Sequence, residues 1–142
     1  MSEANGGAID RNTLPTHTFD WGLIKWLVSP GGTQGAKFTL GEVVILPGAG
    51  HTRHNHPDEE EILYILSGEA EQMVADGEPF PVRGGDAIYI PAGVYHSTIN
   101  TGWEPVRLIA IYNPGGPEVG LTTLEDYREV PPGSAPSLVR GS

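Results

Sequence analysis

The sequence predicts an all-β fold, arranged as one barrel or sandwich domain. Of its 142 residues, 20 are Gly and 13 are Pro, and both residue types interrupt long helices. Runs of branched and aromatic residues recur at intervals of roughly 8–12 residues, and each run ends at a turn signal. A helical period of apolar residues occurs only around residues 121–127, where it lasts a turn or two. Many short strands joined by tight turns are therefore expected.

Four strands are expected in the first half of the chain. Residues 18–28 (TFDWGLIKWLV) are rich in aromatic and branched side chains, and SPGGTQG ends this run. Residues 37–46 (KFTLGEVVIL) form the next strand, which PGAG ends. Residues 60–68 form the third strand, and residues 69–77 continue from it through a Ser-Gly turn.

Three more strands are expected before the chain becomes irregular at NPGGPEVG. Residues 86–93 end at a Pro-x-Gly turn, and TGWEP separates residues 96–100 from residues 106–112. The domain boundaries that follow are a flexible arm over residues 1–15, one barrel domain over residues 16–130 and a flexible tail over residues 131–142.

Charge and composition exclude several classes of protein. Eighteen acidic residues against eight Lys and Arg give a formal net charge of −10, which repels nucleic acid and anionic lipid. The chain has no Cys, so it has neither a disulfide framework nor a thiolate metal site. No run approaches the roughly 18 apolar residues of a membrane helix, and the polar start is unlike a secretory signal. We expect a cytoplasmic protein with neither nucleic-acid nor membrane partners.

The strand at residues 60–68 is apolar on both of its faces. Leu63 and Ile65 would share one face, and Ile62, Tyr64 and Leu66 the other. A strand with one face in water would alternate between apolar and polar residues. A second layer is therefore expected over the outer face, either from the same chain or from a partner subunit.

We expect a homodimer, with residues 18–28 contributing to the interface. The apolar side chains of that segment are too many for one wet face: Trp21, Leu23, Ile24, Trp26, Leu27 and Val28. The alternative is that residues 121–130 fold back over these faces within one chain.

Four of the five histidines lie in two short stretches of the chain. His54 and His56 are two residues apart, so in an extended segment both project to one face. Glu61 opens the strand that follows, and His96 lies much later in the chain. A His-x-His pair with a carboxylate and a remote histidine is a ligand set for a divalent metal ion.

The residues around these groups form two spaced patterns. The first is Gly48-x5-His54-x-His56-x4-Glu61-x6-Gly68, and the second is Gly85-x5-Pro91-x-Gly93-x2-His96-x3-Asn100. Together they resemble the two motifs of the cupin superfamily, as found in small single-domain proteins of the cupin 2 type. The resemblance covers about residues 37–112 and meets every fixed position of both motifs, in the right order.

This resemblance implies a double-stranded β-helix, or jelly-roll, barrel with a metal ion inside. It carries over His54, His56, Glu61 and His96 as the ligands of one divalent ion per chain. Mn, Fe, Ni, Co, Cu and Zn all accept this ligand set, and the sequence does not choose among them. The glycines and Pro91 would serve the backbone turns.

Several neighbouring residues have less certain roles. Glu60 competes with Glu61 as the carboxylate ligand, but alternation directs its side chain to the opposite face. Asn100 is expected to be structural or to line the pocket. His51 is either a solvated loop residue or a group at the pocket mouth, and His17 has no assigned role.

The sequence leaves the catalytic residues unknown. The candidates for proton transfer are Tyr64, Tyr95, His51, Glu42 and Gln72. Alternation directs both tyrosines outward, whereas Glu42 has the parity of an inward-facing residue or of one at a wet edge.

Three functions remain open. The first is a metal-dependent enzyme of isomerase or lyase type, acting on a small oxygenated metabolite such as a sugar, sugar acid or keto compound. The second is a dioxygenase of the quercetinase or diketone-cleaving type. The third is a non-catalytic module that binds a small molecule through its metal ion.

Overall fold

The strands of the chain form two antiparallel sheets, as the composition predicts. A computed structural model describes residues 6–137. The first half contains η1 (Arg11–Thr13), β1 (Thr16–Phe19), β2 (Gly22–Val28), β3 (Thr39–Ile45), β4 (Gly50–His54) and β5 (Glu60–Ser67). The second half contains β6 (Glu69–Val74), β7 (Phe80–Arg83), β8 (Ala87–Ile90), β9 (His96–Asn100), β10 (Val106–Asn113), α1 (Glu118–Leu121) and β11 (Arg128–Val130).

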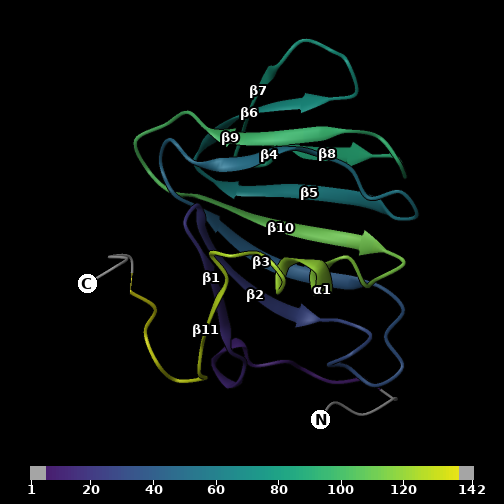
Figure 1. Cartoon of the computed structure of the whole chain (residues 1–142), viewed down its shortest axis with the longest axis vertical. Helices are drawn as coiled ribbons and strands as arrows, with labels where there is room; N and C mark the ends of the chain where they lie inside the picture. Colours follow the sequence, from purple (N-terminus) through teal and green to yellow (C-terminus); the bar gives the residue numbers. More distant parts are fainter. Residues whose placement is uncertain (1–5, 138–142) are drawn as a thin grey trace.

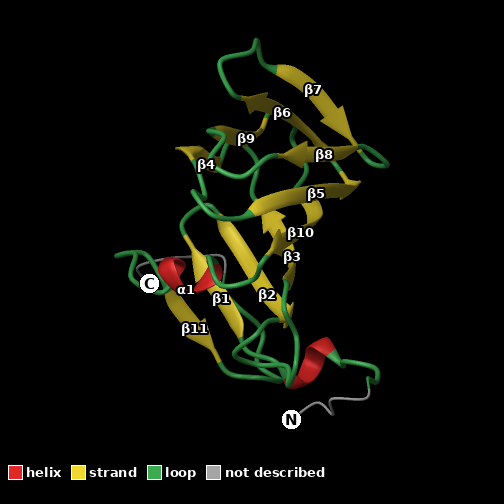
Figure 2. Cartoon of the chain, turned by 90° about the vertical axis from the view of Figure 1, so that its right-hand side faces the viewer, coloured by secondary structure: helices red, strands yellow, loops and turns green. Residues whose placement is uncertain are grey.

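The two sheets combine strands that are far apart in the sequence. The larger sheet has the order β11-β1-β2-β3-β10-β5-β8, and the smaller has the order β4-β9-β6-β7. Figure 1 shows β10, from late in the chain, between β3 and β5. In Figure 2, β11 lies beside β1 at the edge of the larger sheet. The all-β jelly-roll expectation is confirmed.

Alternating side chains build the interior between the sheets. In β3, Val43 and Ile45 are buried, whereas Val44 between them is only half-buried. In β10, Val106 and Leu108 are buried in the same way, and β5 adds inward residues of its own. Because these strands are neighbours in the sheet, their inward residues pack as one apolar core. This core supports the side chains that form the site.

Two predictions about the strands are wrong. The run 18–28 is not one strand but the hairpin β1–β2: Asp20 and Trp21 form the turn, which the aromatic continuity concealed, and Gly22 follows it as the first residue of β2. Gly22 is needed there, since a side-chain carbon at this position would lie 1.9 Å from the carbonyl oxygen of Val44. Strands β4, β7 and β11 were not expected as separate elements, and the only α-helix of the described residues is a single turn that begins at Glu118, before the stretch 121–127.

The ends of the domain are partly described. The expected arm, residues 1–15, contains η1, and Arg11 of that helix pairs with Glu42 of β3. Residues 1–5 and 138–142, in the expected arm and tail, lie outside the described residues. No helix among residues 6–137 is long and apolar enough to cross a membrane.

The outer face of β5 has no cover from the described part of the chain. Ile62, Tyr64 and Leu66 are each about 40% exposed, whereas Leu63 and Ile65 on the inner face are buried. Residues 121–130 do fold back, but β11 pairs with the edge of β1 and not with this face. The sequence allowed the outer face of β5 to be covered either by the same chain or by a partner subunit. Residues 6–137 provide no such layer.

Candidate metal centre

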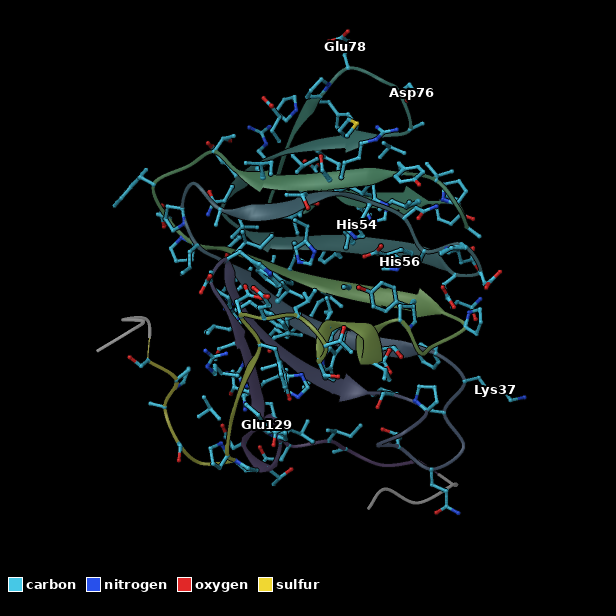
Figure 3. The ribbon with its side chains drawn as sticks, viewed as in Figure 1. Lys37, His54, His56, Asp76, Glu78 and Glu129 are labelled. Carbon is cyan, nitrogen blue, oxygen red and sulfur yellow. The ribbon has the colours of Figure 1, made fainter. Side chains whose placement is uncertain are left out.

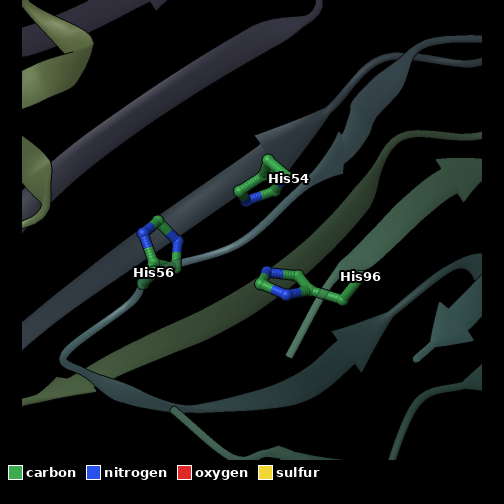
Figure 4. A group of neighbouring side chains, drawn as sticks. All are labelled: His54, His56 and His96. Carbon is green, nitrogen blue, oxygen red and sulfur yellow. The ribbon is translucent and has the colours of Figure 1, made fainter. Parts of the chain in front are cut away.

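Three histidines, two from neighbouring strands and one from the following loop, meet at one end of the smaller sheet. His54 is the last residue of β4, His96 is the first of β9, and the two are directly paired across the strands. His56 lies two residues beyond β4, in the loop that leads to β5. One ring nitrogen of each histidine lies within 4.8 Å of the others. Figure 3 places His54 and His56 inside the fold, and Figure 4 shows the three rings turned toward a common point.

Glu61 reaches this cluster from the opposite sheet. It lies on β5, is only 5% exposed, and places Oε1 at 3.0 Å from Nε2 of His96 and at 3.5 Å from Nε2 of His56. The four residues that the motifs single out therefore converge between the two sheets. That they bind a metal ion remains a prediction, which the structure supports through the chemistry of these atoms.

The unpaired atoms of the cluster fit a divalent metal ion. Nε2 of His56, Nε2 of His96 and Oε1 of Glu61 are all buried without a hydrogen-bond partner. Buried polar atoms are rarely left unpaired unless a ligand or ion satisfies them. Lone pairs of imidazole and carboxylate pointing at one place are the donors that borderline divalent ions prefer.

The backbone holds two of the imidazoles in the orientation that metal binding needs. Nδ1 of His54 lies 2.7 Å from the carbonyl oxygen of Thr52, and Nδ1 of His96 lies 3.0 Å from that of Val94. When Nδ1 donates to a carbonyl, the proton stays on that nitrogen and the lone pair of Nε2 is free. The local backbone thus selects the tautomer that binds a metal ion through Nε2.

The electrostatics of the cluster keep most of its imidazoles neutral. Burial lowers the pKa of His54 and His56 below the ordinary value of 6.5. Burial acts on His96 in the same direction, but the adjacent carboxylate of Glu61, 3.0 Å away, outweighs it and raises the pKa of His96. Without a metal ion, His96 is therefore the histidine of the cluster that holds a proton to the highest pH.

A cavity of about 30 Å³ lies beside these ligands, with room for about two water molecules. Its walls combine aliphatic side chains such as Leu63 with the polar groups of Trp26, His51 and Tyr112. Burial and the charges of Glu61 and Glu118 raise the pKa of Tyr112 well above its ordinary value, so its hydroxyl stays protonated.

His51 lies in the wall of this cavity and is not a solvated loop residue. It belongs to β4, and its ring is 4.2 Å from that of Trp21 and 5.5 Å from that of His54. Burial and the neighbouring histidines lower the pKa of His51 to about 3, so its imidazole is neutral near neutral pH. Of the two roles left open by the sequence, the structure favours the one at the pocket.

The other candidates for proton transfer lie away from the cavity. Tyr64 and Tyr95 are 42% and 46% exposed and face outward, as alternation predicts. Glu42 lies on the outer side of β3, where it pairs with Arg11 and Arg107, so an inward orientation is wrong. Gln72 is buried but does not line the cavity, and its Oε1 accepts a hydrogen bond from Thr98.

Two wall residues could not be identified from the sequence. Trp26 faces the interior because it has the same parity as the buried Ile24 and pairs with Gly41 of β3, and the bulge between Trp26 and Val28 begins only after it. Tyr112 lies near the end of β10, and nothing in the sequence of that strand distinguishes it from an ordinary packing residue. The only available signal was Gly41, whose missing side chain leaves room for the indole ring.

Comparison with known proteins agrees with this architecture. A family model described as a cupin domain (Cupin_2) matches residues 41–112. The chain is 36% identical over 100 residues to uncharacterized protein MJ1618 of Methanocaldococcus jannaschii, covering 70% of this chain and 79% of that one. It is 30% identical over 121 residues to polyketide synthase CurC of Streptomyces cyaneus, covering 85% and 78%. Oxalate decarboxylase of Lactobacillus farciminis, solved as a formate complex, superposes with a TM-score of 0.67 at 26% identity, covering 80% of this chain and 37% of that one.

Proposed function

This chain belongs to the family of cupin domains, and from that premise we propose that it is a metal-dependent enzyme acting on a small keto compound. The observation that carries the proposal is the convergence of His54, His56, His96 and Glu61, with three unpaired buried atoms, beside a cavity. A metal ion bound there supplies Lewis-acid chemistry, which polarises a carbonyl group and favours loss of a proton from the adjacent carbon. Isomerisation, enolisation and β-elimination all begin in this way.

The residues of the chain supply binding, orientation and exclusion of water. His54, His56, Glu61 and His96 would hold the ion, and an ion that prefers six ligands would still accept a substrate with two neighbouring oxygen atoms. His51 is neutral and lies in the cavity wall, so it can accept a hydrogen bond from an enol or hydroxyl group. The aliphatic and aromatic walls limit the water around the reacting atoms, which strengthens each polar contact.

The size of the cavity and the named relatives support a keto compound within the broader class of sugars, sugar acids and keto compounds. About 30 Å³ admits only the reacting end of a substrate, so the rest of the molecule would remain at the mouth. One relative that covers most of this chain is named a polyketide synthase protein. Polyketide chains carry carbonyl groups in 1,3-relation, and two such oxygens can chelate one metal ion.

Metal loading followed by a substrate panel tests the proposal. The protein would be loaded in turn with Mn, Fe, Ni, Co, Cu and Zn, and offered sugars, sugar acids, keto acids, 1,3-diketones and catechol-like compounds. Proton NMR in deuterated water detects enolisation, and an oxygen electrode detects dioxygenase activity. Deuterium incorporation without oxygen uptake, lost in the double variant His54→Ala/His56→Ala, is the expected result. Oxygen consumption would favour the dioxygenase, and tight binding without turnover would favour the binding module.

We also propose that the protein is a homodimer that buries the outer face of β5. Ile62, Tyr64 and Leu66 form an apolar row on this face, and Tyr89 of the neighbouring β8 is 57% exposed beside them. Continuous exposed apolar surface of this kind marks an interaction site. Of the run 18–28, Leu23 lies on the outer side, where it pairs with Val44 of β3, so the N-terminal contribution would be limited to such residues. A cytoplasmic location remains a prediction.

A further inference from the structure

The cavity wall contains a hydrogen-bond donor that the protein itself does not use. Trp26 lines the same cavity as the metal cluster, and its Nε1 is buried without a hydrogen-bond partner among the described residues. An indole nitrogen is a donor only, and a buried donor without an acceptor destabilises a folded protein. No acceptor among residues 6–137 reaches this N–H, so an acceptor supplied from outside the chain explains the arrangement.

The backbone around Trp26 is arranged to hold the indole in this place. Trp26 pairs with Gly41 of β3, and a side-chain carbon at Gly41 would lie 2.6 Å from Cε3 and Cζ3 of the indole. The benzene side of the ring therefore lies directly over Gly41, and Nε1 lies on the opposite side of the indole. A bulge in β2 directly after Trp26 also changes the register of β2 against β3.

The indole is also close to the metal cluster. Its ring centre is 6.0 Å from that of Tyr112, whose ring centre in turn is 5.0 Å from that of His56. One aromatic ring thus separates Trp26 from a predicted metal ligand. A small molecule that occupies the cavity beside the metal ion would lie between the ligands and the indole.

We propose that Nε1 of Trp26 donates a hydrogen bond to an oxygen atom of the substrate, and that Gly41 is the residue that makes this position possible. The inference rests on the proposed function and refines it: the substrate presents an oxygen acceptor, such as a keto, enolate or carboxylate oxygen, to the indole N–H in the same cavity. Trp26 is thereby a residue that determines specificity, separate from the residues that bind the metal.

The test follows the indole N–H directly, without measuring turnover. The chain has three Trp residues, so the zinc-loaded protein labelled with ¹⁵N at indole gives three N–H resonances, and Trp26→Phe identifies one of them. Malonate, a stable dicarboxylate with oxygens in 1,3-relation, serves as the probe. We expect malonate to shift the Trp26 resonance strongly and to leave that of Trp103, which is 86% exposed, unchanged.

Two variants separate recognition from packing. Trp26→Phe removes the donor and keeps most of the ring, so we expect zinc affinity and stability to be retained while malonate binds about tenfold more weakly. Gly41→Ala displaces the indole, and we expect the same loss of malonate affinity with zinc still bound. Trp103→Phe is the matched control and should bind malonate as the unmodified protein does.

The outcomes distinguish the inference from the proposed function. If malonate changes the visible spectrum of the cobalt-loaded protein, but Trp26→Phe binds it unchanged and the indole resonance does not move, the role of Trp26 is wrong and the metal enzyme stands. If zinc and cobalt do not bind at the cluster, both proposals are overturned.

Discussion

Glu60 and Glu61 are consecutive in β5 but belong to opposite sides of the larger sheet. Glu61 points between the sheets and places Oε1 at 3.0 Å from Nε2 of His96. Glu60 points outward, where it accepts hydrogen bonds from the hydroxyl of Tyr89 and the amide of Asn113, each at 2.8 Å. The strand period of two thus gives two adjacent carboxylates entirely different surroundings.

This difference predicts unequal effects of removing the two charges. Glu61→Gln should weaken metal binding by at least about tenfold, because the amide loses the negative charge and a lone pair that faces the ion. Glu60→Gln should leave metal affinity within about twofold, since its contacts lie on the other side of the sheet. Competition with a chromophoric chelator measures both, and equal losses would show that the register of β5 is shifted by one residue.

Removing histidines should reduce metal content in proportion to the ligands lost. The double variant His54→Ala/His56→Ala should purify without metal, whereas His96→Ala should retain a weaker site, because three of the four ligands remain. His17→Ala is the control, since His17 lies in β1 beside Tyr127 and Glu129, apart from the cluster. Full metal content in the double variant, measured by elemental analysis of the purified protein, would refute the assigned ligands.

Metal affinity should rise with pH through the range where His96 loses its proton. The negative charge of Glu61 raises the pKa of His96 above 6.5 in the metal-free protein, so binding near neutral pH must expel this proton. The pKa values of His54 and His56 are lowered, so their protons compete only below that range. Affinity should therefore fall as pH drops through the raised pKa of His96, and fall further as the other two protonate.

Calorimetry in two buffers of different ionisation enthalpy counts the protons that are released. We expect metal binding to release a fraction of a proton per ion bound near pH 6.5 and no proton at about pH 9. The variant Glu61→Gln should move the release to lower pH, because the group that raises the pKa of His96 is gone. Release that is independent of this substitution would contradict the assigned cause.

Asn100 is predicted to stabilise the protein by joining the two sheets and the loop after β9. It is fully buried, and its Nδ2 donates to the carbonyl oxygens of Ile45 at 2.9 Å and Glu104 at 2.8 Å. Its Oδ1 accepts a hydrogen bond from the backbone N–H of Gly102 at 2.9 Å. Asn100→Ala leaves these groups unpaired and should lower the free energy of unfolding by about 2–4 kcal/mol.

Urea denaturation of the metal-free protein measures this loss. Thr101→Ala is the neighbouring control at an exposed position, and it should change the free energy of unfolding by less than about 0.5 kcal/mol. An effect of Asn100→Ala as small as that of the control would mean that water replaces all three hydrogen bonds.

The homodimer should depend on the outer face of β5. Ile62→Glu places a charge in the middle of the apolar row, so light scattering at micromolar concentration should give the mass of a monomer. Phe80→Glu is the matched control, because Phe80 is equally exposed, at 39%, but lies on β7 of the smaller sheet. A monomeric mass for the unmodified protein would eliminate the dimer, and a dimer that persists in Ile62→Glu would move the interface to another face.

The sequence was most informative where spacing and backbone geometry act together. His54 and His56 are directed alike by the period of an extended chain, and Gly68, with φ of 91°, provides the turn that sends the chain from one sheet to the other. Most strands were also identified within a few residues, because turn residues border each of them. Such features depend on residues close together in the chain, so the amino-acid sequence alone is enough to predict them.

The features that the sequence did not reveal depend on distant contacts. Strand β11 is only three residues long, and its pairing with β1 is what makes it a strand. Strand β7 contains Pro81, which argues against a strand from local preference alone. His51 in the cavity wall lies against the ring of Trp21 from the β1–β2 turn, and Trp26 lies over the bare backbone at Gly41 of β3, so both positions likewise depend on residues distant in the sequence.

The interleaved order of the larger sheet has a consequence for synthesis on the ribosome. Strand β3 lies between β2 and β10, so one of its two edges stays without its native neighbour until β10 has been translated. During this interval the apolar residues of β2 and β3 lie at an unpaired strand edge, and such edges are prone to aggregation. Residues His54, His56 and Glu61 are also translated before His96, so the cluster is complete only after most of the barrel has been made. The proposed metal site can therefore be complete only on a chain that has been almost fully translated.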